Sequence, residues 1–164
     1  MTDLQGLIEK HRSNGLLIDT NLLLLYVVGR TNKNRIPNFK RTQKYTIEDF
    51  ELLTDLIRQF RVLITTPHVL TEVSNLAALH GAELSAFRRL FKQTIEEMDE
   101  QYDESRLIAG HSSFERLGLA DAAISTLSRR SFLVLTDDLD LHAALSQAGV
   151  DAINFNHIRT LFWQ

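Results

Sequence analysis

The sequence predicts a three-layer α/β/α sandwich with a central parallel sheet of about four to five strands. Short apolar runs without a polar residue, such as Leu16–Ile18 and Phe132–Leu135, are typical of strands buried on both faces. Amphipathic helical segments alternate with these runs, as they do in parallel α/β domains. The 164 residues suffice for one core of ordinary size, so we expect a single domain over residues 1–164.

The first part of the chain places one expected strand between two helices. Apolar positions predict a helix over Leu4–Arg12, which the turn at Ser13-Asn14-Gly15 would end. Leu16–Ile18 is the first strand, and Asp19 stands where that strand would end. A second helix is expected over Asn21–Val28, with its apolar side chains in the core or in an interface.

A basic segment follows, over residues 29–45. It contains six of the 18 Lys and Arg residues and none of the 21 Asp and Glu residues, whereas the whole chain has a net charge of −3. Gly29, Pro37 and the lack of an apolar period predict a loop or mobile arm. A solvated loop and a clamp for RNA phosphates are equally favoured, and base stacking on Phe39 and Tyr45 is a weaker alternative. The candidate nucleic-acid-binding residues are Arg30, Lys33, Arg35, Lys40, Arg41 and Lys44.

Helix-starting signals mark the middle of the chain. Thr46–Asp49 resembles a capping box and opens a helix whose apolar stripe extends to Phe60. Val62–Ile64 is the second expected strand. Thr66-Pro67 then combines a cap with a proline at the first helical position, and predicts a helix toward Leu79.

The last part of the chain repeats the alternation of helix and strand. The region 99–118 suggests only short helices and turns, and the third strand is the Phe132–Leu135 run already named. Besides these, we expect helices over Glu83–Met98, Ala120–Ser128 and Leu139–Gln147, and a fourth strand over Val150–Phe155.

Composition narrows the class of protein. The chain is 44% hydrophobic and 24% charged, close to the average of globular proteins, and it contains no cysteine for a disulfide or a thiolate metal site. The N-terminal residues lack the apolar core of a signal peptide, and the longest apolar run, Leu22–Val28, is too short to span a bilayer. We therefore expect a cytoplasmic protein without a membrane partner.

Acidic residues follow two of the expected strands. Asp19 comes directly after the first strand, and Asp137 and Asp138 come after the third. The carboxyl ends of parallel strands meet at one edge of a sheet, and ligands bind there. Glu72 and Asp121 lie near the N-terminal ends of helices, which reach the same edge. Clustered carboxylates repel one another unless a cation neutralises them, and oxygen ligands favour Mg²⁺ or Mn²⁺.

Four motifs in order resemble those of the PIN-domain nuclease family, which includes toxin ribonucleases. Leu17–Asn21 is similar to the first motif, an apolar strand that ends in Asp-Thr-Asn. Thr66–Val73 resembles the second motif, with Glu72 in the acidic position, and Leu119–Ile124 resembles the third, with Asp121. Leu135–Asp140 resembles the family's Thr-x-Asp-x-Asp element. The resemblance extends over most of the chain, although the interval between the first two motifs is longer than in compact toxin members.

The resemblance implies an endoribonuclease that uses one or two Mg²⁺ or Mn²⁺ ions to hydrolyse RNA phosphodiester bonds. It also implies the toxin of a toxin–antitoxin pair, with an antitoxin protein as partner, and we expect a homodimer. Asp138 is the best fourth acid, with Asp137 and Asp140 as alternatives. Catalytic positions implied by the resemblance are Asp19, Glu72, Asp121 and Asp138; metal ligands are these four and Asp140; supporting residues are Asn21 and Thr136.

Structural explanations compete with these roles. Taken singly, Asp19 or Asp138 is more often a turn former or a helix N-cap than a ligand. Asp121 is equally typical of an exposed first-turn acid, and Glu72 of a solvated helix residue. The six histidines lack the spacing of zinc ligands on a helix. The C-terminal Leu161-Phe162-Trp163 is interpreted as core or interface.

Two other functions are open to the same fold. A PIN-like module could bind nucleic acid or protein without catalysis, in which case metal binding would be absent. A phosphorylated receiver domain also places acids at strand ends, but it needs an acidic pair on the first strand and a late lysine, which the sequence does not provide in that pattern.

Overall fold

The structure is a computed structural model that describes residues 3–127 and 130–162. In these residues five parallel strands form one sheet, in the order β3-β2-β1-β4-β5. Leu16 of the central strand β1 lies opposite Leu63 of β2 and Leu133 of β4. The strands are β1 Leu16–Ile18, β2 Leu63–Thr65, β3 Asp99–Glu100, β4 Leu133–Thr136 and β5 Ala152–Asn154.

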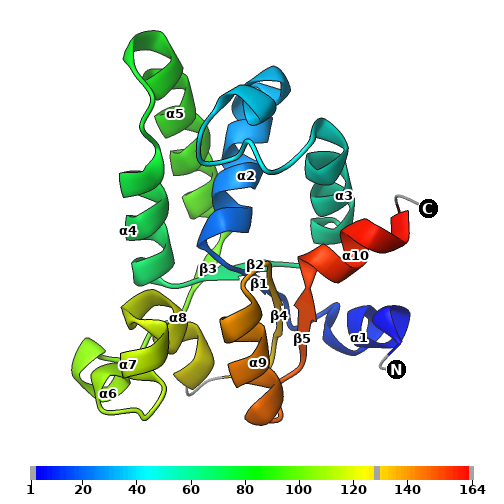
Figure 1. Cartoon of the computed structure of the whole chain (residues 1–164), viewed down its shortest axis with the longest axis vertical. Helices are drawn as coiled ribbons and strands as arrows, with labels where there is room; N and C mark the ends of the chain where they lie inside the picture. The colour runs from blue at the N-terminus through cyan, green and yellow to red at the C-terminus, as the bar shows by residue number, and fades with distance from the viewer. Residues whose placement is uncertain (1–2, 128–129, 163–164) are drawn as a thin grey trace.

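Helices cover both faces of this sheet, so the fold is the expected three-layer α/β/α sandwich. Figure 1 shows on one face the helices α2 Thr20–Thr31, α3 Ile47–Ile57, α4 Pro67–Leu76 and α5 Gly81–Glu97. The other face carries α1 Leu4–His11, α8 Leu119–Thr126 and α9 Leu139–Gln147. The short helices α6 Ser105–Ala109 and α7 Phe114–Leu117 lie beside α8, and α10 Phe155–Phe162 directly follows β5.

The core lies where β1 and β4 meet α2. All residues of both strands are buried, as expected of strands covered on two faces. The apolar stripe Leu22–Leu25 of α2 is also fully buried, which confirms its assignment to the core. A smaller cluster of Ile108, Ala122 and Ala123 packs α6 against α8. This second cluster holds the N-terminal end of α8 against the rest of the domain.

The expected helix starts are confirmed at two positions. Thr46 and Asp49 form a reciprocal capping box at α3, with hydrogen bonds of 2.9 and 3.1 Å between side chain and backbone. The Thr66 hydroxyl caps α4 by accepting from the Val69 amide at 3.1 Å. The helix that begins at Pro67 ends at Leu76, earlier than the predicted position.

The basic segment at residues 29–45 is packed and partly helical, which corrects the prediction of a mobile arm, whereas its last residues, 39–45, form turns as a loop does. Its first residues continue α2 to Thr31, and a 3₁₀ helix η1 follows over Lys33–Asn38. Gly29 lies within α2, where a Cβ would stand 2.2 Å from the ring of Phe50 on α3. A glycine costs about 1 kcal/mol in a helix, and here it permits the close packing of α2 on α3.

Several other predictions need correction. The two-residue strand β3 was not predicted, because its exposed Asp99 and Glu100 have no apolar pattern. The last strand is shorter than Val150–Phe155, and Phe155 instead begins α10. Leu161 and Phe162 are exposed rather than core residues, whereas Ser128 and Trp163 lie outside the described residues. Within the described ranges, no helix is long and apolar enough to cross a membrane.

Candidate active site

Asp19 lies at the carboxyl end of β1, where the strand turns into α2. It is buried and caps α2, with Oδ1 accepting from the Leu22 amide at 3.2 Å. Its Oδ2 accepts from the Asp137 amide at 3.1 Å and from the Thr136 hydroxyl. The helix-cap explanation is therefore correct for Asp19, and it coexists with a place in the acidic cluster. Burial, followed by the charge of Asp137, raises the pKa of Asp19 from 3.8 to about 8.

Asp121 and its neighbours form the more open part of the cluster. Asp121 is half-buried in the first turn of α8. Burial raises its pKa to about 7, together with the charges of Asp138 and Glu72 and a smaller contribution from Asp137. The structure thus brings together side chains from α4, α8 and the end of β4, which lie far apart in the sequence. Their mutual repulsion identifies a region of uncompensated negative charge.

Glu72 is exposed on α4 but is oriented by the end of β1. The Thr20 hydroxyl donates to its Oε2 at 3.0 Å, so the glutamate is tied to the residue that follows Asp19. Asp138 caps α9 and accepts from the Leu141 amide at 2.9 Å, as the helix-cap explanation predicts. Asp140 is exposed in the first turn of α9. Asp138, rather than Asp140, is the member of this pair whose charge acts on Asp121.

Asp137 has a different environment from the other acids. Its side chain is 3% exposed, and Oδ2 accepts from the Lys44 ammonium at 2.6 Å and from the Tyr45 hydroxyl. Asn21 donates to Oδ1 at 3.4 Å, so the expected supporting residue supports Asp137. Burial alone would raise the pKa of Asp137, but the hydrogen bonds from Lys44 and Tyr45 lower it below its usual value. Asp137 is the neutralised acid of the cluster.

The second expected supporting residue, Thr136, connects the two halves of the site. Its hydroxyl donates to Asp19 and accepts from the Asp138 amide at 3.0 Å. Thr136 is fully buried at the end of β4, so this connection is fixed by the sheet. His68, at the start of α4, has its Nε2 3.1 Å from the Ser105 hydroxyl. That contact directs the ring toward α6.

The donor set fits a hard cation, but it is not a preformed coordination shell. In residues 3–127 and 130–162, no three Asp, Glu or His side chains are placed to hold one ion together. The two most buried acids are turned toward backbone amides or toward Lys44, whereas Glu72 is exposed and Asp121 half-buried. Carboxylate oxygens and uncompensated charge are what Mg²⁺ and Mn²⁺ require. Binding of one ion by three of these side chains would therefore need some of them to change conformation.

Several basic side chains of the segment 29–45 contact residues of neighbouring helices. Arg30 donates to the Thr94 hydroxyl at 3.0 Å, Lys33 pairs with Glu51 at 3.1 Å, and Arg35 pairs with Glu83 at 3.1 Å. Phe39 and Tyr45 are buried, which contradicts the suggestion that they stack on bases. Lys40 and Arg41 are exposed. Of the six predicted nucleic-acid-binding residues, Lys44 is the one in contact with the acidic cluster.

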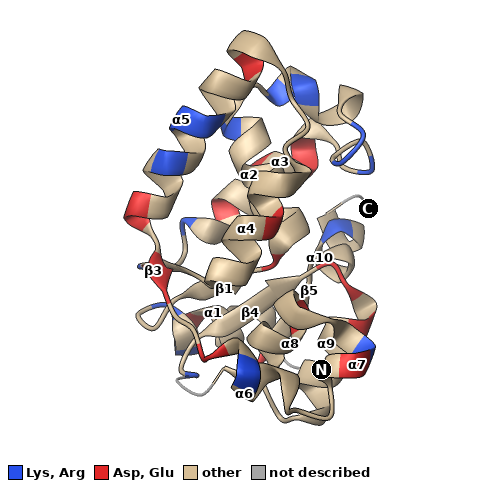
Figure 2. Ribbon diagram, turned by 90° about the vertical axis from the view of Figure 1, so that its left-hand side faces the viewer, with Lys and Arg blue, Asp and Glu red and all other residues tan. Residues whose placement is uncertain are grey.

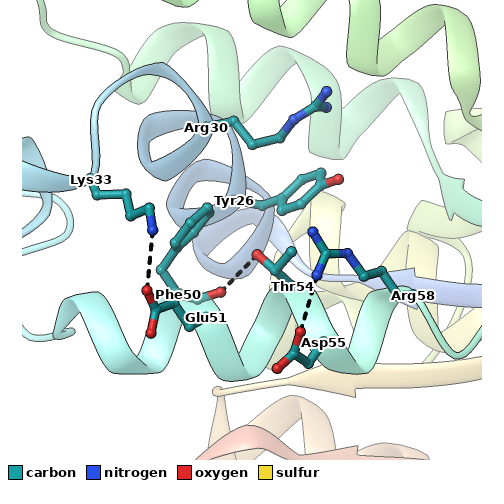
Figure 3. Close-up of a pocket in the computed structure, with 8 residues that line it drawn as sticks. All are labelled: Tyr26, Arg30, Lys33, Phe50, Glu51, Thr54, Asp55 and Arg58. Atoms are coloured by element: carbon teal, nitrogen blue, oxygen red, sulfur yellow. Dashed lines mark hydrogen bonds and ion pairs between the residues drawn. The ribbon is translucent and has the colours of Figure 1, made fainter.

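A separate hollow of about 550 Å³ lies between α2 and α3 (Figure 3). Tyr26 and Phe50 form its apolar part. Of the charged side chains around it, Arg58 pairs with Asp55 on α3 at 3.2 Å, and Lys33 of η1 pairs with Glu51 of α3 at 3.1 Å. Since it contains none of the strand-end acids, this hollow is not the candidate active site.

Sequence reasoning missed the residues that hold Lys44 in place. Asp49 was expected only as a capping residue, yet it is fully buried and pairs with Arg159 of α10 at 2.8 Å. Arg159 also donates to the Lys44 carbonyl at 3.1 Å and stacks over the Tyr45 ring, 5.3 Å from its centroid. A buried acid and an arginine more than a hundred residues apart give no periodic signal. Only the packing of α10 on the basic segment reveals the pair.

The fold and the strand-end acids define a class, a three-layer α/β/α domain with an acidic site at the carboxyl edge of its sheet. Comparison with known proteins does not narrow this class. No protein-family model matches the chain, and no curated protein matches its sequence significantly. The resemblance to PIN-domain nucleases therefore rests on the four sequence motifs.

Proposed function

We propose that this protein is a divalent-metal-dependent nuclease, and specifically an endoribonuclease that hydrolyses RNA phosphodiester bonds. The observation that carries the proposal is the acidic cluster at the carboxyl edge of the sheet. Asp19 and Asp121 have raised pKa values there, first because they are buried and then because other acids lie close to them. A fold maintains such repulsion at a cost, and the binding of a cation offsets that cost.

Each side chain has a distinct role in this proposal. Thr136 and the backbone amides fix Asp19 as the buried ligand, while Asp121 and Glu72 supply more exposed carboxylates. Asp138 adds negative charge beside Asp121 and remains a ligand directly or through water. When bound, Mg²⁺ or Mn²⁺ makes water a stronger nucleophile and stabilises negative charge on the phosphate. RNA is proposed over DNA on the strength of the family resemblance.

The same resemblance supports a biological setting as the toxin of a toxin–antitoxin pair. An antitoxin protein that covered the carboxyl edge would block access of RNA to the acids. A homodimer is part of this proposal. Expression of the chain without a partner should then arrest bacterial growth, and Asp121→Asn should relieve the arrest. Growth unaffected by abundant, folded wild-type protein would argue against the toxin role.

A second candidate is a binding module without catalysis. It is favoured by one observation, the absence of a ready-made group of three metal-binding side chains in the described part of the chain. Under this alternative, Lys44 would serve as the counter-ion of the acidic cluster, and no further cation would be needed. The two candidates differ in whether divalent cations bind to the folded protein.

Cleavage of labelled RNA and single-stranded DNA, with Mg²⁺ or Mn²⁺ and with chelator, tests the proposal. We expect RNA cleavage that chelator abolishes, and a loss of roughly 100-fold or more in Asp19→Asn and Asp121→Asn, because each removes a ligand charge. Asp55→Asn is the matched control, since Asp55 is an exposed acid on α3 outside the cluster. Absence of cleavage by folded wild type, or equal activity in all variants, would overturn it.

A further inference from the structure

We propose that Lys44 is the substrate-binding cation of the acidic site, and that Asp137 anchors this lysine instead of binding metal. The ammonium would contact a phosphate oxygen of the RNA strand beside the carboxylates. This inference rests on the proposed nuclease function and deepens it, because it names the group that receives the substrate's charge. It also removes Asp137 from the alternatives for the fourth ligand.

The Asp137 carboxylate already accepts from three donors. One of its carboxylate oxygens accepts from both the Lys44 ammonium and the Tyr45 hydroxyl, and the other accepts from Asn21. The side chain is 3% exposed. Burial and the Asp137 charge raise the pKa of Tyr45, so its hydroxyl keeps its proton and remains a donor. A metal at Oδ2 would have to displace a buried phenol as well as the lysine, and a metal at Oδ1 would have to displace the Asn21 amide.

Lys44 itself is accessible to a ligand. Its side chain is 54% exposed although its ammonium lies 2.6 Å from the Asp137 carboxylate. An ammonium has three donors, and one carboxylate oxygen uses one of them. The remaining donors are left for a ligand beside the acidic cluster, where an approaching strand would otherwise meet repulsion. A cation at this position offsets part of that repulsion and fixes where a phosphate can lie.

The backbone around Lys44 is held by α10. Arg159 donates to the Lys44 carbonyl at 3.1 Å, and its guanidinium makes two hydrogen bonds of 2.8 and 2.9 Å to the fully buried Asp49. Tyr45, the next residue, is 1% exposed and packs near Phe155 with ring centroids 6.5 Å apart. These contacts prevent the segment from swinging away. Lys44 therefore belongs to the rigid part of the site.

The inference is tested by the salt dependence of RNA binding. Each phosphate contact by a cation on a single strand contributes about 0.7 to the slope of log K against log salt concentration. The probe is a short, fluorescein-labelled single-stranded RNA with Mg²⁺, and every protein carries Asp121→Asn so that the probe stays intact. Lys44→Met should weaken binding about fivefold to tenfold at moderate salt and lower the slope by about 0.7. Lys44→Arg should keep the slope.

The matched control is Lys10→Met. Lys10 also pairs with an aspartate, Asp151, at 2.6 Å, but it lies at the opposite edge of the sheet, so its loss should leave the slope unchanged. A purely structural role for Lys44 would lower the thermal midpoint without changing the slope. If Lys44→Met still binds RNA with an unchanged salt slope, this inference is wrong, but the proposed function is not affected. Absence of RNA binding in every variant would overturn it together with the proposed function.

Discussion

The two edges of the sheet contain the same kind of ion pair in opposite electrostatic settings. At the amino edge, Asp151 accepts from Lys10 at 2.6 Å and from His11 at 2.8 Å. These hydrogen bonds hold the pKa of Asp151 below its usual value. At the carboxyl edge, Lys44 pairs with Asp137 at 2.6 Å, but other acids surround this pair.

The difference separates a structural pair from a functional one. At the amino edge the charge of Lys10 balances that of Asp151, and His11 is a second partner of the same carboxylate. At the carboxyl edge, Lys44 neutralises Asp137, while Asp19 and Asp121 keep raised pKa values. Perturbed carboxylates that cluster at strand ends are typical of functional sites. Figure 2 shows that acidic and basic residues are spread over several elements, so net charge alone does not locate the site.

The largest expected effect on stability concerns the contact that holds Lys44 at the carboxyl edge. Arg159→Met leaves the buried Asp49 carboxylate without its guanidinium, and should cost about 3 kcal/mol of unfolding free energy. Lys10→Met breaks an exposed pair and should cost less than about 1 kcal/mol. Urea denaturation of both variants measures the two costs. The double variant Asp49→Asn/Arg159→Met should recover part of the lost unfolding free energy. Equal costs for Arg159→Met and Lys10→Met would contradict the distinction between the two edges of the sheet.

A second, smaller effect is the pH dependence of the carboxyl edge. Asp19 and Asp121 have folded pKa values of about 8 and 7, above the ordinary 3.8, so the folded protein binds their protons more tightly. The metal-free protein should therefore lose stability as pH rises from about 4 to about 8, by about 1 to 2 kcal/mol. Mg²⁺ should reverse the loss. Thermal midpoints across this range test the expectation, and a wild-type profile no steeper than that of the double variant Asp19→Asn/Asp121→Asn would contradict it.

The smallest effect is expected at the amino edge, with the opposite sign. The pKa of Asp151 is lowered in the folded state, so its contribution is present above the ordinary pKa near 3.8 and is lost as pH falls below it. Because Asp151 is partly exposed, Asp151→Asn should cost no more than about 1 kcal/mol at pH 7. Its cost should shrink toward zero at pH 3. If the cost of Asp151→Asn grew on acidification, the pairing of Asp151 with Lys10 would not be its cause.

The sequence predicted the parts of this protein that depend on local patterns. Leu16–Ile18 and Leu139–Gln147 have the bounds expected, and the capping box at Thr46 forms as predicted. The strand β3 escaped prediction because a two-residue exposed strand has no apolar signal. The packed basic segment escaped it because Ile36, Phe39 and Tyr45 have no regular spacing, although all three are buried.

The candidate site, like the fold, could be predicted from the sequence only in part. From the sequence, the ends of two expected strands place Asp19 and Asp138 at one edge of the sheet. In the structure, the expected supporting residue Thr136 contacts Asp19. The sequence could not show that Asp137 is paired with Lys44, because the two residues are 93 positions apart and meet only in the folded chain. Whether the acids bind metal, and which of them do so, remains a prediction from the motifs and from the charge of the cluster.

The most direct test of a cation site at the carboxyl edge is Mn²⁺ binding to the metal-free protein, followed by the electron paramagnetic resonance signal of free Mn²⁺. The account predicts saturable binding of one or two ions to wild type, loss of that binding in Asp121→Asn, and unchanged binding in Asp151→Asn at the amino edge. Folded wild-type protein that binds no Mn²⁺, or an Asp121→Asn variant that binds it as wild type does, would contradict the account.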